Sequence, residues 1–195
     1  MDKKVYYHAS QQKDIKVLEP RISNHNKPLI YFSSKRENVL VYLSNAIEKF
    51  CKETNYEYEG IYSTWGPYSF TKEGLLQLEE YYENALKDTY QGVSGYIYTV
   101  EEIPNKEILS DIKDVYVTNQ KVTVTKCEYI KDAYEEIIKA YELGLINILK
   151  YEDLSDTKIN WLNDIIPKEY KEAVDHPEYR YFLENKFSHM NLNDN

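Results

Sequence analysis

A histidine beside two small residues lies at the start of the part of the chain that could do chemistry. Residues 5–10 form an apolar run that ends in His8, Ala9 and Ser10. An imidazole nitrogen can hydrogen-bond a ligand hydroxyl, and small neighbours let a ligand approach the backbone. We therefore predict a ligand-binding histidine at the end of a buried strand.

A tyrosine follows in a second phrase of the same kind. Residues 29–34 form an apolar run that carries Tyr31 and ends in Ser33 and Ser34. A phenol ring can stack on a ligand ring and also form a hydrogen bond. His8 or Tyr31 alone is more often an ordinary strand residue, but the two together, each before small residues, predict one site. We expect the two strands to be neighbours and both side chains to face one cleft.

The elements that position these residues follow from the spacing of apolar side chains. Besides the two phrases, strands are expected over residues 92–100, with 95–100 as its clearest part, over 115–117 and over 122–130, with a hairpin over 56–70. Helices are expected over residues 39–50, 72–88 and 132–144, followed by two or three short helices broken at Pro167 and Pro177. The order of elements predicts an α+β fold with a mixed or antiparallel sheet core and flanking helices, without the βαβ alternation of a Rossmann domain.

Composition narrows the classes of function. A formal net charge of −9 disfavours a nucleic-acid-binding surface, which needs a basic face. The 42% hydrophobic share favours a folded globule. Cys51 and Cys127 stand apart, which favours a reducing compartment. The first residues hold too few apolar side chains for a signal peptide, and no run reaches the length of a membrane span. We expect a cytoplasmic protein without a membrane partner.

Several common sites are excluded by motif. The sequence contains no GxGxxG, no GxxxxGK[ST] and no HExxH, and its four histidines are too scattered to predict a metal site. The paired carboxylates at residues 79–80 and 135–136 suit solvated helix faces better than acid–base catalysis. The 21 tyrosines are mostly expected at the rim of the core.

The two phrases together resemble the N-terminal half of the ADP-ribosyltransferase fold. Residues 7–10, then 15–20, then 30–34 leading into a helix are similar to the diphtheria-toxin and poly(ADP-ribose) polymerase branch. That branch has a His followed by Gly or Ala and then Ser on its first core strand, and a Tyr on the next strand. The resemblance covers residues 4–50 and continues over 90–130 only as strands of the right kind.

The resemblance implies NAD as a substrate and assigns a role to each residue of the two phrases. His8 would hydrogen-bond a ribose hydroxyl, and the backbone at Ala9 and Ser10 would hold the nicotinamide amide. Tyr31 would line the nicotinamide pocket, and a hydroxyl from Ser33 or Ser34 would lie near the amide. His8 and Tyr31 would be the catalytic pair, and no metal is expected.

The third motif of the family, a Glu on a late strand before a hydrophobic residue and Ser or Thr, has no clear match. If Thr118 takes the Ser or Thr position, Val115 or Tyr116 stands where the Glu would be. The possible substitutes are Asp114, Gln120 and Glu128. Family members without the Glu tend to transfer single units or to be inactive.

Two hypotheses therefore stay open. In the first, the chain binds NAD and transfers ADP-ribose to a macromolecule, with a protein acceptor favoured over DNA, or hydrolyses NAD. In the second, it is a catalytically degenerate module that binds a nucleotide or a protein. In both, we expect an ADP-ribosyltransferase-like α+β domain over residues 1–150 and a helical C-terminal extension over 151–195, packed on the same domain.

Overall fold

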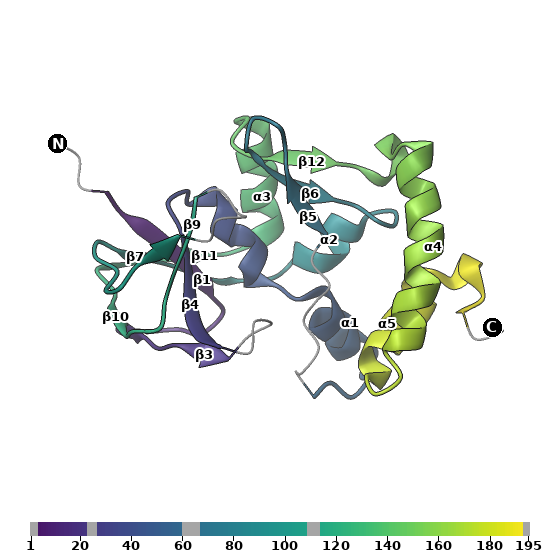
Figure 1. Cartoon of the computed structure of the whole chain (residues 1–195), viewed down its shortest axis with the longest axis horizontal. Helices are drawn as coiled ribbons and strands as arrows, with labels where there is room; N and C mark the ends of the chain where they lie inside the picture. Colours follow the sequence, from purple (N-terminus) through teal and green to yellow (C-terminus); the bar gives the residue numbers. More distant parts are fainter. Residues whose placement is uncertain (1–3, 23–26, 60–66, 109–113, 193–195) are drawn as a thin grey trace. The chain divides into compact units, whose positions relative to one another are not determined.

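The computed structural model describes residues 4–22, 27–59, 67–108 and 114–192. It is 38% helix and 25% strand with mainly antiparallel strand pairing, which confirms the predicted α+β class (Figure 1). Two compact units can be distinguished. Unit 1 comprises Met1–Ser44, Phe70–Leu76 and Tyr90–Ile146, and unit 2 comprises Asn45–Ser69, Gln77–Thr89 and Asn147–Asn195. The domain boundary expected at residue 150 stays a prediction.

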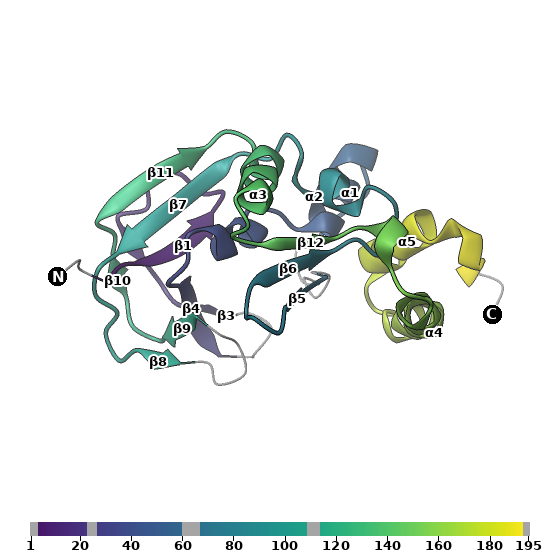
Figure 2. The same ribbon diagram turned by 90° about the horizontal axis from the view of Figure 1, so that it is seen from above.

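A seven-stranded sheet organises unit 1. Its order is β11 (Lys126–Ile130), β7 (Gly95–Val100), β1 (Tyr6–Ser10), β4 (Pro28–Ser33), β9 (Val115–Thr118) and β8 (Glu107–Ile108), and β3 (Arg21–Ile22) also pairs with β4. Figure 2 shows β11, β7 and β1 side by side. β1 pairs with β7 along its whole length. Within the described ranges, β1 pairs with β4 only at Tyr7 and Ser33, so the ladder between the two predicted site strands is open beyond this pair.

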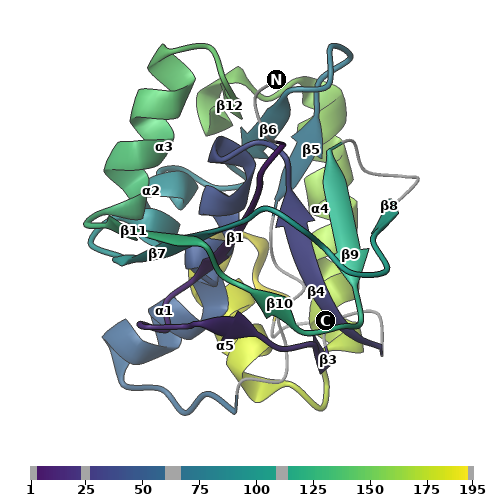
Figure 3. The same cartoon turned by 90° about the vertical axis from the view of Figure 1, so that its left-hand side faces the viewer.

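Different elements cover the two faces of this sheet. Because side chains alternate along a strand, Tyr6 and His8 share one face. There a hydrophobic cluster joins the sheet to the paired strands β2 (Val17–Leu18) and β10 (Val122–Thr123). The cluster consists of Tyr6, Leu18, Ile30, Phe32, Val100, Tyr116 and Val122. The strands β1, β4 and β9 that carry most of it can be followed in Figure 3. The 3₁₀ helix η1 (Glu37–Leu43) packs against β1 and β7 and contacts α3 (Ala133–Glu142).

Close packing of η1 on the sheet makes Gly95 sensitive to substitution. A Cβ at this position would lie 2.6 Å from Leu43 Cδ2 and 3.2 Å from the carbonyl oxygen of Ser10. We expect Gly95→Ala to lower the free energy of unfolding by about 1–3 kcal/mol, the usual cost of overpacking, in urea titrations. The exposed neighbour Ser94 provides the control Ser94→Ala, and equal stability of the two variants would contradict this packing.

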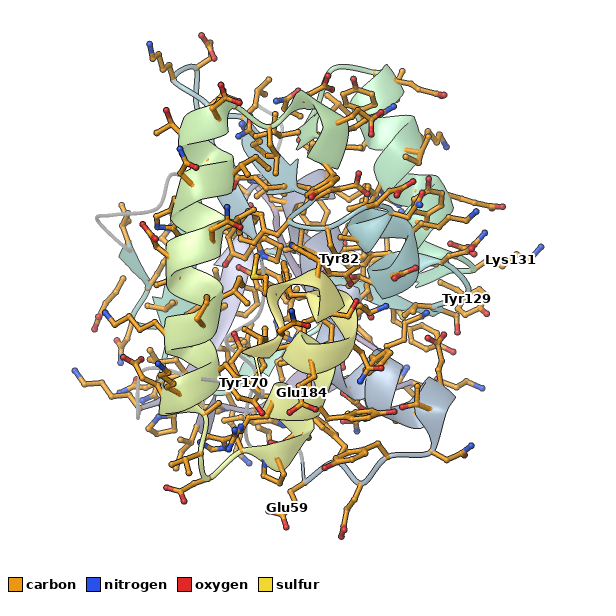
Figure 4. All side chains as sticks on the ribbon, turned by 90° about the vertical axis from the view of Figure 1, so that its right-hand side faces the viewer. Glu59, Tyr82, Tyr129, Lys131, Tyr170 and Glu184 are labelled. Carbon is orange, nitrogen blue, oxygen red and sulfur yellow. The ribbon has the colours of Figure 1, made fainter. Side chains whose placement is uncertain are left out.

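Unit 2 is built around a second hydrophobic cluster, to which α1 (Ala46–Thr54), α4 (Asp156–Glu172) and α5 (Pro177–Lys186) contribute. The hydroxyl of Tyr170 on α4 donates to the carboxylate of Glu184 on α5, and the two labelled side chains lie together in Figure 4. Most of a three-stranded sheet also belongs to this unit, in the order β12 (Asn147–Leu149), β6 (Leu76–Glu79), β5 (Tyr68–Phe70). The remaining elements are α2 (Ala85–Tyr90), η2 (Tyr151–Asp153) and η3 (Ser188–Met190).

The helix predicted over residues 72–88 is wrong over residues 72–84. The Thr71 amide donates to the Leu75 carbonyl at 2.8 Å, and Gly74 has a φ of 81°, so the chain turns tightly there. Leu76 and Leu78 are then buried two residues apart on β6, which is strand periodicity. Of the predicted helix only α2 remains. The leucines at residues 75–78 fit the periodicity of a helix and that of a strand, and pairing with β5 and β12 selects the strand.

The helix predicted over residues 39–50 divides into two. Asn45 is extended, and its side chain accepts hydrogen bonds from the amides of Ile47 and Glu48, which begins α1 as a new helix. The break predicted at Pro167 is also wrong, because α4 continues through it, whereas Pro177 begins α5 as expected. In the predicted 56–70 hairpin, residues 60–66, including the expected turn at Trp65, lie outside the described residues.

Candidate functional site

The ring of His8 reaches from β1 to the backbone of β4, next to the single paired position of these two strands. Its Nδ1 lies 2.9 Å from the carbonyl oxygen of Tyr31, and its ring packs near Phe32 with 5.9 Å between centroids. A carbonyl oxygen only accepts, so Nδ1 carries the hydrogen and Nε2 of the neutral ring is an acceptor. The strand thus holds an acceptor nitrogen in a fixed place, which suits a ligand hydroxyl.

Burial lowers the pKa of His8. The hydrogen bond to the Tyr31 carbonyl opposes this effect by favouring the charged ring, and the positive charge of Arg21 adds to the lowering. The pKa therefore lies below its ordinary value, and the imidazole is neutral at pH 7. A neutral ring is the form in which Nε2 can accept a hydrogen bond.

This shift predicts how stability depends on pH. Unfolded His8 titrates at about 6.5, above its folded pKa, so protons favour the unfolded chain. The neutral His8 ring therefore contributes its full stabilisation of the fold above about pH 6.5. That stabilisation is lost as the pH falls below this value toward the folded pKa. We expect the free energy of unfolding to fall less steeply below about pH 6.5 in His8→Gln than in the wild type, in urea titrations at each pH. His189→Gln is the control, and parallel curves for His8→Gln and the wild type would contradict the shift.

Tyr31 is on the neighbouring strand, as expected, but its ring does not share the face of His8. Tyr31 pairs with Val117 and Phe32 with Tyr116 in a regular β4–β9 ladder, so Tyr31 and Phe32 project to opposite faces. The ring of His8 lies beside Phe32. The expectation that both rings face one cleft is therefore wrong, and the two residues meet through the His8 ring and the Tyr31 backbone, at the opening between their strands.

The end of β4 brings two serines to an acidic residue. Ser34 donates from its backbone amide to the Asp114 carbonyl at 3.1 Å and from its hydroxyl to Asp114 Oδ1 at 3.2 Å. Lys35 Nζ lies 3.4 Å from Asp114 Oδ2. The buried Ser33 accepts from the Lys35 amide at 3.1 Å. Asp114 thus stands at the same end of β4 as both predicted serines, one residue before β9.

The other two possible substitutes for the family Glu lie elsewhere. Glu128 on β11 receives two hydrogen bonds from Arg36, at 2.9 and 2.6 Å, and Arg36 also bonds Glu136 on α3. The hydrogen bonds from Arg36 lower the pKa of Glu128. Gln120 follows the opposite end of β9, where its backbone amide donates to the Thr118 hydroxyl. Asp114 is therefore the only one of the three candidates beside the predicted serines.

The small residues after His8 differ in their surroundings. Ala9 is buried and pairs with Ile97 of β7. Ser10 is half-buried, and its hydroxyl accepts from the Gln12 amide at 3.1 Å. The structure thus brings Ala9 close to His8 at the opening, whereas the Ser10 hydroxyl is directed to the loop after β1.

Sequence reasoning named Asp114 without favouring it. Its position depends on the antiparallel pairing of Ser33 with Val115, a contact between distant parts of the chain. One feature of the sequence could have indicated this position. Residues 115–118 predict a strand, and if that strand pairs with β4, the residue before it lies at the end of β4.

The residues that the structure describes show neither a metal site nor a membrane-spanning helix. No group of three or more His, Cys, Asp or Glu among them could hold a metal ion. Within the same ranges, no helix combines the length and the apolar character that crossing a bilayer requires.

Comparisons with protein-family models, with curated proteins and with solved structures found no match to this chain.

Proposed function

We propose that this chain is an ADP-ribosyltransferase-like protein of the diphtheria-toxin and poly(ADP-ribose) polymerase branch, which binds NAD and transfers ADP-ribose to a macromolecule or hydrolyses NAD. One observation carries the proposal. His8 reaches across an open ladder to the strand of Tyr31, and its second ring nitrogen is left as an acceptor. A ligand that reaches the unpaired part of this ladder would meet the His8 ring and the backbone of Tyr31.

Each residue of the two phrases has a task in this proposal. Nε2 of His8 accepts from a ribose hydroxyl and fixes the sugar. The backbone at Ala9 holds the nicotinamide amide, where the small side chain leaves room, and the backbone carbonyl of Tyr31 on the neighbouring strand holds the His8 ring in place. Orienting the sugar in this way favours reaction at its anomeric carbon.

The reaction itself needs a negative charge near the ribose. When the bond from the anomeric carbon to the nicotinamide nitrogen breaks, its electron pair leaves with nicotinamide and positive charge develops on the sugar. A carboxylate fixed nearby stabilises that charge. Asp114 is our candidate for this role, because Ser34 and Lys35 hold its side chain at the end of β4. The nucleophile that then attacks is a protein side chain or water.

The alternative function is a catalytically degenerate module that binds a nucleotide or a protein. The absence of a Glu from β9 favours this alternative. The ion pair between Asp114 and Lys35 also favours it, because it already uses the charge of Asp114. The two functions differ in one measurable property, because a degenerate module would bind NAD without releasing nicotinamide.

The test is NAD binding by calorimetry together with nicotinamide release by chromatography. We compare the wild type with His8→Gln and Tyr31→Ala, and use Tyr129→Ala, at an exposed tyrosine of β11, as the control. Binding with release, both lost in His8→Gln and kept in Tyr129→Ala, supports the enzyme, and their loss in Tyr31→Ala as well would show that the Tyr31 side chain also contributes to the site. Binding without release supports the degenerate module, and no binding overturns both versions of an NAD site.

A further inference from the structure

Two lysines and two tyrosines form a compact group on unit 1 that the proposed chemistry does not use. Lys4 Nζ donates to the Tyr116 hydroxyl at 3.2 Å, and Lys106 Nζ donates to the Tyr6 hydroxyl at 2.6 Å. Each ammonium also lies over both rings, 4.8–5.6 Å from their centroids. The rings contact edge to face, with 5.0 Å between centroids.

No described carboxylate lies within ion-pair distance of this group, and Asp114 adds only a weaker, longer-range attraction to Lys4. Neither Lys4 nor Lys106 lies within 4.0 Å of a described acidic oxygen, in a chain whose net charge is −9. Two neighbouring ammonium groups repel each other unless an anion lies between or beside them. The pair is held in place nevertheless, because Tyr6 and Tyr116 are 4% and 8% exposed and belong to the core.

The group presents mainly hydrogen-bond donors. Each tyrosine oxygen accepts from a lysine, so its own O–H can donate to a ligand, and each ammonium keeps further N–H groups. Two cations with two hydroxyl donors match the several acceptor oxygens and the charge of a phosphate group.

The group also lies on the same face of β1 as His8. Tyr6 and His8 are two residues apart, and they pair with Val100 and Tyr98 of β7. Alternate residues on a strand share a face and are about 6–7 Å apart. A phosphate held at Tyr6 would therefore be within reach of a sugar held at His8.

We propose that Lys4, Lys106, Tyr6 and Tyr116 form a phosphate-binding subsite that holds the diphosphate of a dinucleotide. The identification of the ligand as a dinucleotide rests on the proposed function, whereas the preference for phosphate rests on the four side chains alone. Free pyrophosphate has the same chemistry and is the probe that separates the two statements.

The experiment measures binding of pyrophosphate and of NAD by calorimetry at low ionic strength. The test variant is Lys4→Gln/Lys106→Gln. The control, Lys126→Gln/Lys131→Gln, removes the same charge at β11, the opposite edge of the sheet from β8, and Figure 4 shows Lys131 extending outward. Thermal melts check that each variant is folded.

We expect the test variant to bind both ligands at least roughly tenfold more weakly, with the control unchanged, and wild-type binding to weaken as salt is added. Binding of pyrophosphate alone, lost in the test variant, supports the subsite and overturns the proposed function. Binding of NAD with equal affinity by wild type and test variant overturns the subsite and leaves the proposed function. Binding of neither ligand overturns both.

Discussion

Replacing Asp114 by asparagine is expected to slow nicotinamide release by roughly 100- to 1,000-fold while NAD still binds. This is the range lost when one electrostatic group that stabilises a transition state is removed. The substitution keeps the size of the side chain and an oxygen that can accept from Ser34, 3.2 Å away in the wild type. It removes the charge that would face the developing cation.

The control for this variant is Asp14→Asn. Asp14 and Asp114 both have positive φ, at 60° and 62°, a conformation that asparagine adopts readily. The two substitutions therefore make the same change in charge and in backbone preference. Single-turnover release by chromatography and binding by calorimetry separate the chemical step from affinity. Release by Asp114→Asn at the rate of Asp14→Asn would exclude Asp114 as the acid of this site.

Elements fixed by local signals were predictable from the sequence. The β7 strand lies within the predicted residues 92–100 and ends where predicted, because residues 95–100 combine aromatic and β-branched side chains. The α3 helix also follows its local signals. The Asp132 side chain accepts from the amides of Tyr134 and Glu135, and Gly144, with a φ of 69°, follows its end. Neither element needs a distant partner to explain where it begins.

Elements decided by distant partners were not predictable in this way. Residues 76–79 became a strand because β5 and β12 pair with them, and β12 itself was not predicted. The site shows the same limit. The sequence predicted that His8 and Tyr31 lie on neighbouring strands, but the faces of their rings depend on the register of β4 with β9 and on the opening beside β1. Asp114 joins Ser34 through the same register.

The second large effect is expected in unit 2, where Lys158→Met should lower the free energy of unfolding by about 3 kcal/mol. Glu79 is 8% exposed and receives hydrogen bonds from Ser69, Gln77 and Tyr81 at 2.7–3.0 Å. Its only described cation is Lys158, at 2.8 Å. Burial by itself raises the pKa of Glu79, but the hydrogen bonds from Lys158, Ser69 and Gln77 outweigh it and the pKa is lowered.

Methionine at position 158 would keep an apolar side chain of similar length but lose the ammonium group, which lies over Trp161, and would leave Glu79 as a buried charge without a cation. Lys168→Met, at an exposed position of the same helix, controls for the substitution itself. The double variant Glu79→Gln/Lys158→Met removes both charges and should recover much of the loss, because a buried pair contributes less than either unpaired charge costs. Equal stability of the double variant and Lys158→Met would contradict this origin of the effect.

The pH dependence gives an independent check on the same pair. In the wild type the pKa of Glu79 is lowered, so its contribution is present above the unfolded value of about 4.3 and is lost as the pH falls through the folded pKa. In Lys158→Met the lowering by the cation is lost while burial remains, so the pKa of Glu79 is higher than in the wild type and protonation relieves part of the cost. The difference in unfolding free energy between wild type and variant, from urea titrations, should therefore shrink as the pH falls below about 4.3. A difference that stays constant with pH would mean that Lys158 stabilises unit 2 by packing on Tyr81 and Trp161 rather than by its charge.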